Sequence, residues 1–281
     1  DITAKAITGS ITAANKVYDA NASATILSRT LTGVLGADVV SYSGGAASFS
    51  DRNVAAGKTV TGTGLSLLGT DAGNYTVNGT ALTTADIARA PLSIAANSAT
   101  RLYGAANPAF SANYSGFQGA ETTAALTGTL ALATPAVAGS STGHYVITPS
   151  GQSSTNYAIS YVGGTLNVTP VPLLVSAQAR SKVYGTSDPA LTYGVTGLVN
   201  NPALGVVDTT ATVFSGALSR ARGATVLGGP SAVTPGTLVA DGPHTMGGLT
   251  GNPLAIPPDA LAEPPTRQDR RSGTRRTRRH L

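Results

Sequence analysis

The stretch that decides the fold is NYAISYVGGTLNVTP, at residues 156–170. Its apolar side chains fall on every second position, at Tyr157, Ile159 and Tyr161. A period of two with one apolar face predicts a half-buried strand, because successive side chains of a strand point to opposite faces. Gly163-Gly164 separates this run from the next apolar run, as a tight hairpin or a bulge requires. The stretch therefore predicts two consecutive strands.

The alternation extends back through the preceding residues. We expect six strands, at roughly 91–96, 109–115, 127–133, 144–149, 156–162 and 164–169. Asn107-Pro108 and Asp188-Pro189 suit the first two positions of a type I turn. No segment combines ten or more residues of helical periodicity with capping residues. Helix is therefore expected only as single turns within 119–126 and 199–206.

Three landmarks of the sequence recur with one period. Tyrosine-centred runs contain the motif tyrosines Tyr18, Tyr103 and Tyr184, which recur roughly every 80–85 residues. The Asn-Tyr pairs at Tyr75 and Tyr157 keep the same spacing, and so do the opening residues Asp1-Ile2 and their match Asp86-Ile87. A shared period of about 80–85 residues indicates small domains in series, each able to fold around a modest core.

The expected fold class is all-β, a tandem array of small antiparallel β domains. An immunoglobulin-like sandwich is favoured, with a β-grasp-like sheet as the alternative. Ten Tyr, four Phe and no Trp make tyrosine the expected large core residue. The expected boundaries are 5–90, 91–170 and 171–256 for the repeats, and 257–281 for a disordered Arg/Pro-rich tail.

The composition argues against an enzyme or a metalloprotein. Only 11% of residues are charged, and the absence of Cys excludes a disulfide scaffold, a thiolate metal site and a cysteine nucleophile. Glycine pairs such as Gly33 and Gly36 neither open a helix nor end in Gly-Lys-Ser/Thr, so no phosphate loop is predicted. The acids stand singly beside turn residues, whereas Ca²⁺ needs six to eight clustered oxygens. We expect no catalytic residue, no metal and no cofactor.

The net charge of +5 comes mainly from the end of the chain. Residues 1–256 hold 11 Lys and Arg against 10 Asp and Glu, whereas 257–281 hold seven Arg against three acids. The body therefore has no electrostatic bias towards nucleic acid. We interpret the arginine-rich end as divergent or frameshifted, with solvated disorder or an anion-binding patch as alternatives.

The ends and the apolar runs give two further expectations. No apolar run reaches the roughly 18–20 residues that a membrane span needs. The sequence begins with Asp1 and shows no signal peptide. We therefore expect a segment of a longer protein.

The landmarks resemble two related repeat families of bacterial surface proteins. The run at Tyr18-Asp19 resembles the YDG repeat, and those at Tyr103-Gly104 and Tyr184-Gly185 resemble the MBG domain of the Tyr-Gly type. The stretch 156–170 is similar to the last hairpin of the MBG domain. Over about residues 1–256, the resemblance implies a repetitive stalk in a haemagglutinin-like, two-partner secreted exoprotein of Gram-negative bacteria. Such repeats bring no established catalytic residues, so none is carried over.

The sequence departs from the family pattern at Ala20 and in the third repeat, and each departure predicts a local change in structure. Ala20 stands where the family has Gly, so we expect its turn to avoid positive φ. In the third repeat the Asn-Tyr landmark is replaced near His244. Four prolines fall within 230–253, and proline cannot donate to a central strand ladder. We expect a lost strand near 225–228 and looser packing in this repeat.

Each repeat carries a cation two residues before its motif tyrosine, at Lys16, Arg101 and Lys182. We expect the tyrosine to be buried at the core edge, covered by the stem of the cation, with the adjacent Gly104 or Gly185 in a turn. A repeated contact with carbohydrate or an anion is the alternative. No ligand-binding residue follows from the sequence.

The sequence favours a structural role. We expect a stalk segment of a secreted or surface-displayed, repetitive adhesin-like protein, with short proline-containing joints at 86–91 and 168–173. The alternative is a binding module whose repeats contact host glycan or matrix protein multivalently. The expected partners are an outer-membrane secretion transporter for the full-length protein and, under the alternative, a host surface ligand. Neither specific nucleic-acid binding nor a membrane span is expected.

Overall fold

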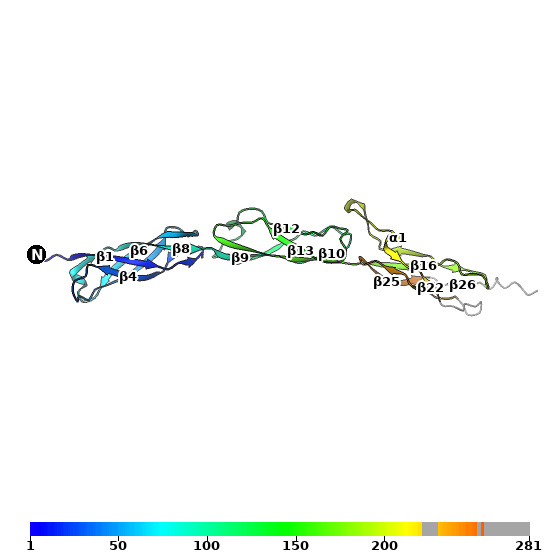
Figure 1. Cartoon of the computed structure of the whole chain (residues 1–281), viewed down its shortest axis with the longest axis horizontal. Helices are drawn as coiled ribbons and strands as arrows, with labels where there is room; N and C mark the ends of the chain where they lie inside the picture. The colour runs from blue at the N-terminus through cyan, green and yellow to red at the C-terminus, as the bar shows by residue number, and fades with distance from the viewer. Residues whose placement is uncertain (221–229, 252–253, 256–281) are drawn as a thin grey trace, which may run out of the picture. The chain divides into compact units, whose positions relative to one another are not determined.

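The computed structural model describes residues 1–220, 230–251 and 254–255 and is almost entirely β (Figure 1). The all-β prediction is confirmed. The expected tail at 257–281 and the expected strand loss near 225–228 lie outside the described residues. Within the described part of the chain, no helix is long and apolar enough to cross a membrane.

The chain divides into two compact units. Unit 1 comprises Asp1–Arg101, Asn107–Val137 and Gly143–Asn167, whereas unit 2 comprises Leu102–Ala106, Ala138–Thr142 and the chain from Val168 onward. Unit 1 thus holds the first repeat and most of the second. Two short segments of the second repeat, and its last three residues, belong with the third repeat in unit 2.

The first repeat folds into two sheets. In one sheet β1 lies between β4, its antiparallel neighbour, and β7, its parallel neighbour. In the other, β8 pairs parallel with β2 and antiparallel with β6, and the sheet continues through β5 to β3. The elements are β1 Lys5–Ala13, β2 Lys16–Val17, β3 Ser23–Ala24, β4 Ile26–Thr32, β5 Ser41–Phe49, β6 Ala55–Leu68, the 3₁₀ turn η1 Ala72–Asn74, β7 Tyr75–Val77 and β8 Thr80–Ala88.

The second repeat keeps this framework. Its first strand, β9, lies between antiparallel β11 and parallel β14, and β15 lies between β10 and β13 in the other sheet, which ends at β12. The elements are β9 Ala90–Ala96, β10 Ala99–Leu102, β11 Ala112–Ser115, η2 Thr123–Ala125, β12 Ala131–Ala133, β13 Gly143–Ser150, β14 Tyr157–Val162 and β15 Gly164–Thr169.

The third repeat retains the central strands of that framework. Its first strand, β16, lies between antiparallel β18 and parallel β25, and β17 pairs parallel with β26. The elements are β16 Val171–Ala177, β17 Arg180–Ser181, β18 Tyr193–Thr196, β19 Asn200–Asn201, η3 Pro202–Leu204, β20 Val206–Val207, α1 Thr210–Val213, β21 Phe214–Ser215, β22 Ser219–Arg220, β23 Val233–Thr234, β24 Val239–Ala240, β25 His244–Gly251 and β26 Leu254–Ala255.

The parallel pairs correct the prediction of purely antiparallel domains. In every repeat the first strand pairs in parallel with the strand that begins at the Tyr75, Tyr157 or His244 landmark. Of the two alternatives at Gly163-Gly164, a tight hairpin or a bulge, the hairpin is wrong, because β14 and β15 lie in different sheets. The chain instead passes from one sheet to the other there. A Cβ on Gly164 would lie 2.6 Å from the backbone oxygen of Ala96, so the glycine permits this close approach.

Most expected strands of the second repeat are found, but the turn positions differ. The turns close from Leu102 to Ala105 and from Val183 to Thr186, centred on the Tyr-Gly pairs and not on Asn107-Pro108 or Asp188-Pro189. The strands expected at 109–115 and 127–133 are shorter, and β10 was not predicted. Single helical turns occur within 119–126 and 199–206, as expected, and α1 is an additional one.

Tyrosine is a large core residue of unit 1, as predicted. One buried cluster joins two repeats, since it contains side chains from the first and from the second. Its members are Tyr18, Phe49, Val60, Ala85, Ile87, Ala90, Leu92 and Tyr157. Burial of apolar surface is the main favourable contribution to folding, so the same core that stabilises each repeat also holds the two together.

Candidate functional site

The motif tyrosine of the first repeat contacts an acid–aromatic pair of the second repeat. Tyr18 is 1% exposed, and its hydroxyl donates a 2.7 Å hydrogen bond to Glu121 Oε1. The Tyr157 hydroxyl donates to Glu121 Oε2 at 2.6 Å. The Tyr18 and Tyr157 rings meet edge to face, with centroids 5.5 Å apart. One carboxylate therefore joins two tyrosines from consecutive repeats, and we call this contact a joint.

Local backbone structure positions both members of the pair. Tyr157 begins β14, whose parallel register places it opposite Ala90 at the start of the second repeat. Glu121 lies in the loop after β11, which turns at Gly116 with a φ of +116°. In that loop the Gln118 N–H donates to the Tyr157 hydroxyl at 2.8 Å. The phenol thus accepts one hydrogen bond and donates another, which fixes its direction.

The joint holds a charged acceptor between neutral donors. Burial raises the pKa of the Glu121 carboxyl, but the hydrogen bonds from Tyr157 and Tyr18 and the charge of Arg52 outweigh it and hold that pKa below its usual value. Burial, together with the bond to Glu121, raises the pKa of Tyr18 to about 12. Arg52 Nη2 lies 3.4 Å from Glu121 Oε1. Charge-assisted bonds of this kind are about twice as strong as neutral ones.

A second joint of the same design lies within unit 2. The Tyr103 hydroxyl lies 3.4 Å from Asp208 Oδ1, and its ring meets His244 edge to face with centroids 5.2 Å apart. His244 Nε2 lies 2.9 Å from Asp208 Oδ2, and Nδ1 lies 2.5 Å from Asp241 Oδ1. Burial and the charge of Asp208 raise the pKa of the Tyr103 phenol. Histidine therefore takes the place of the landmark tyrosine in this joint.

The first repeat carries a third acid–aromatic pair. The Tyr75 hydroxyl donates to Asp38 Oδ2 at 2.5 Å and accepts from the Leu35 N–H at 3.0 Å. Tyr75 is buried at the start of β7. The hydrogen bond to Asp38 raises the pKa of the Tyr75 phenol. The pair reproduces the geometry of Glu121 and Tyr157, and in the described part of the chain no motif tyrosine contacts it.

The acids of the pairs are the functional residues that the sequence reasoning missed. A signal for them exists, since GVLGAD at 33–38 matches GFQGAE at 116–121 at the spacing of the repeats. Gly33 and Gly36, considered above only against a phosphate loop, thus belong to the segment that carries Asp38. The third repeat lacks this signal, because Asp208 lies eleven positions after Gly197, compared with five positions in the other repeats.

The motif tyrosines differ in burial, which corrects the expectation that Tyr103 and Tyr184 are largely buried. Tyr18 is buried, Tyr103 is half-buried, and Tyr184 is 57% exposed. Gly104 and Gly185 occupy turns with φ of +75° and +86°, as expected for these glycines. A Cβ on Gly104 would lie 2.3 Å from Val199 Cγ1, so this glycine also allows close contact within unit 2.

Ala20 is another correction. Its φ is +63°, although we expected this turn to avoid positive φ. The preceding residue, Asp19, accepts hydrogen bonds from Lys16 Nζ at 2.7 Å and from the Asn21 N–H at 3.2 Å. These bonds hold the turn in a shape that places Ala20 in the left-handed region, which costs an L-residue about 1–2 kcal/mol.

The motif cations bind their own loops. Lys16 Nζ donates to Asp19 Oδ1, and Lys182 Nζ donates to Asp188 Oδ1, both at 2.7 Å. Arg101 Nε donates to Asn107 Oδ1 at 2.7 Å. Lys16 also lies over the ring of Phe49, so the aromatic partner differs from the expected motif tyrosine. In the second and third repeats the cation bonds to the residue six positions after it, which is Asn107 or Asp188. The sequence had predicted only a turn at these two residues.

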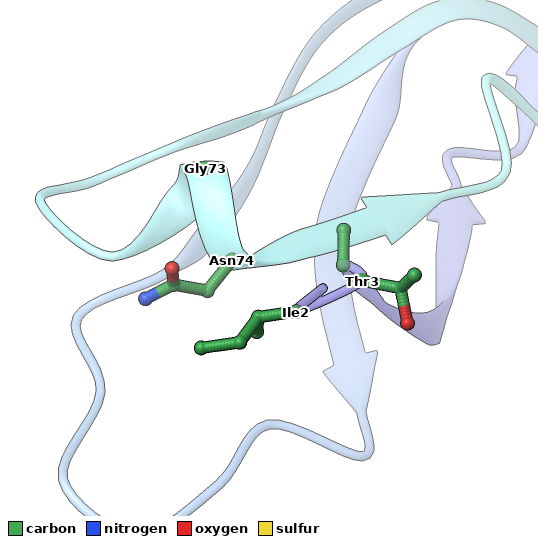
Figure 2. A pocket seen from close by; sticks show the side chains of 5 residues that line it. Ile2, Thr3, Gly73 and Asn74 are labelled. Atoms are coloured by element: carbon green, nitrogen blue, oxygen red, sulfur yellow. The ribbon is translucent and has the colours of Figure 1, made fainter.

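The end of the first repeat near Tyr75 also holds a shallow pocket. It is lined by Ile2, Thr3, Ala4, Gly73 and Asn74, and Figure 2 shows Ile2 and Asn74 at its edge. Across the described residues, no group of three or more His, Asp or Glu side chains could hold a metal ion. The chemistry of the pairs is that of hydrogen bonding and ring packing.

Comparisons with known proteins agree with the repeat structure. The model of the YDG domain matches residues 3–84, and the model of the MBG domain (YGX type) matches residues 92–167 and 173–243. No curated protein matches the sequence. The two MBG matches together cover more than half of the chain. The chain therefore belongs to the MBG domain family, as one YDG domain followed in tandem by two MBG domains.

Proposed function

We propose that this chain is a spacer, a stalk segment of a secreted or surface-displayed, repetitive adhesin-like protein. The observation that carries the proposal is the joint of Tyr18, Glu121 and Tyr157. The motif tyrosine, which recurs in every repeat, is used there to fasten one repeat to the next. A spacer needs such joints, because flexible connections between repeats would let the chain fold back on itself.

Further contacts support a stiff connection in unit 1. The Val54 N–H of the first repeat donates to Asn156 Oδ1 of the second at 3.1 Å, and Arg89 Nε donates to the Thr155 backbone oxygen at 3.1 Å. These bonds join the same two repeats as the shared apolar cluster, against which Val54 packs. Together they restrain rotation as well as separation of the two repeats.

The motif cations favour a spacer over repeated ligand binding. A glycan or anion site needs donors that are open to the ligand, whereas Lys16 and Lys182 expose only 17% and 13% of their side chains. Arg101 is 6% exposed. Their bonds to their own loops stabilise the turn that presents each motif tyrosine.

The cellular setting belongs to the same proposal. We propose export to the cell surface or medium through an outer-membrane transporter, by the two-partner route, as the resemblance to haemagglutinin-like exoproteins implies. A chain without Cys suits that route, because its folding does not depend on oxidation. The proposal includes no catalytic activity.

The test measures the distance between the first and second repeats. The chain has no native Cys, so spin labels can be placed at Leu82→Cys and Val146→Cys, positions that are 66% and 52% exposed. We expect a narrow distance distribution that broadens when Glu121→Gln is added. Tyr42→Phe, which removes a hydroxyl within the first repeat, is the matched control and should leave the width unchanged.

Two results would overturn the proposal. One is a broad distribution in the parent protein that Glu121→Gln does not change. The other is saturable binding of the repeats on a glycan array, which would favour the multivalent binding module.

A further inference from the structure

The pair of Asp38 and Tyr75 has the geometry of a joint that lacks its incoming tyrosine. In the occupied joint, one oxygen of Glu121 accepts from Tyr157 and the other accepts from Tyr18. In the first repeat, Asp38 Oδ2 accepts from Tyr75. Within the described residues, Asp38 Oδ1 accepts no hydrogen bond. A carboxylate oxygen beside a buried aromatic edge is thus available for a phenol.

The neighbouring landmark residue is also without the partner that it has in the joint. In the joint, the Oδ1 atom of Asn156 accepts a hydrogen bond from the Val54 N–H of the preceding repeat. Its counterpart Asn74, one residue before Tyr75, is exposed and lines the pocket in Figure 2. An N–H group brought to this end of the repeat would meet the same amide oxygen.

An apolar residue marks the same end. The period of the repeats relates Ile2 to Ile87, and the strand registers relate both to Val168. Ile87 and Val168 are 2% and 1% exposed, whereas Ile2 is fully exposed beside Asn74. The position is buried where two repeats meet and uncovered where they do not.

We propose that the end of the first repeat marked by Asp38, Asn74, Tyr75 and Ile2 is a docking surface for another repeat of the same kind, which inserts the tyrosine of its cation-x-Tyr motif. Tyr184 is an example of a motif tyrosine that is exposed and could be inserted into such a surface. It carries the same motif, its cation is bound to its own loop, and its ring stays 57% exposed. The motif tyrosines that contact a pair are Tyr18 and Tyr103, and both are less exposed than Tyr184.

The proposal rests on the proposed function, since it treats the pair as the receiving half of a spacer joint. The chemistry selects one occupant. A phenol supplies a donor for Asp38 and a ring edge for Tyr75, and the rest of the incoming repeat supplies apolar surface for Ile2. Continuity with two joints of the same chain identifies that occupant as a YDG or MBG repeat.

The test extends the full chain at this end. A copy of residues 1–89 is fused ahead of residues 5–281, so that the native joint sequence 86–89 replaces residues 1–4. Tyrosine titration by ultraviolet absorbance then counts the phenols whose pKa is raised towards about 12, as that of Tyr18 is. The added copy also brings its own Tyr75, whose pKa is raised by Asp38, so its Tyr18 is identified by the change that Tyr18→Phe in the copy makes to the titration. We expect that change to reveal one phenol whose pKa is raised towards about 12. Asp38→Asn in the receiving repeat should remove it.

Controls make each outcome decisive. Asp86→Asn in the receiving repeat removes the same charge from an exposed position and should keep the additional phenol. If hydrogen exchange shows that the added repeat is unfolded, a copy of residues 90–170, which presents Tyr103, is fused ahead of residue 5 instead. Absence of an additional raised phenol in a folded fusion would overturn the docking surface, as would one that survives Asp38→Asn.

The same titration distinguishes this failure from failure of the proposed function. Glu121→Gln should release the native Tyr18 towards its ordinary pKa. If that occurs while Asp38→Asn leaves the pKa of the incoming Tyr18 unchanged, the docking surface is wrong and the spacer joint stands. If neither substitution has an effect, the joint on which both proposals depend is wrong.

Discussion

Removal of the Tyr18 hydroxyl tests the energy of the first joint. Hydrogen bonds to charged groups contribute about 1.5–3 kcal/mol. The rise of the Tyr18 pKa from 10.0 to about 12 corresponds to about 3 kcal/mol, to which burial of the phenol makes the largest contribution and the bond to Glu121 the next. Tyr18→Phe keeps the ring in the shared cluster and removes only the bond to Glu121. We therefore expect the free energy of unfolding, measured by urea denaturation, to fall by about 2 kcal/mol, within the range for a bond to a charged group.

A double-mutant cycle assigns that loss to the carboxylate. Tyr18→Phe and Glu121→Gln should couple by about 1 kcal/mol or more, because the groups share one bond. Tyr42→Phe removes a hydroxyl that donates to the neutral Asn78 backbone oxygen at 2.7 Å, and it should be additive with Glu121→Gln to within about 0.5 kcal/mol. Equal coupling for both tyrosines, or a cost of Tyr18→Phe no greater than that of Tyr42→Phe, would refute the reasoning.

Three further predictions follow from burial, backbone angle and charge. Truncation to Ala should cost about 3–5 kcal/mol at Tyr18, less at Tyr103 and no more than about 0.5 kcal/mol at Tyr184; equal losses in denaturation midpoints would contradict this order. Ala20→Gly should stabilise the protein by up to about 1 kcal/mol, because glycine accepts a φ of +63° without strain, and an unchanged or lower melting temperature would contradict it. Because the pKa of Glu121 is lowered, its contribution to stability is present at pH values above the ordinary pKa of a carboxyl group and is lost on acidification. Because the pKa of Tyr18 is raised, its contribution is present below pH 10 and is lost between pH 10 and about 12. Melting temperatures across pH should therefore fall at both extremes, and Glu121→Gln should flatten both falls.

The strands were the predictable part of the fold. Strict alternation from Tyr157 onward and at residues 144–149 identified β14 and β13 closely, since it reports that one face of a strand is buried. Alternation does not report which strand is the neighbour or in which direction it runs. The parallel pairing of β14 with β9 and the passage between sheets at Gly163 were therefore not predicted from the sequence.

The candidate site was predicted only in part. The recurring tyrosines indicated where the site lies. However, we expected each motif tyrosine to be buried in the core of the repeat that carries it. Tyr184 shows why that was wrong, because burial of a motif tyrosine comes from the next acid–aromatic pair. Asp38 and Glu121 could have been found by comparing residues 33–38 with 116–121. Asp208 could not, because its separation from Gly197 differs from that in the other repeats.

The parallel pairing of the first strand has a consequence for tension. In the second repeat the chain enters at the start of β9 and leaves β14 at its far end, and these two points lie at opposite ends of one parallel ladder. A pull on the chain therefore acts along the strands, in shear, and the ladder hydrogen bonds between residues 90–95 and 157–162 carry the load together. An antiparallel hairpin pulled from its open end separates one bond at a time. Repeats built on this plan resist extension through the rate at which they unfold, and not only through their equilibrium stability.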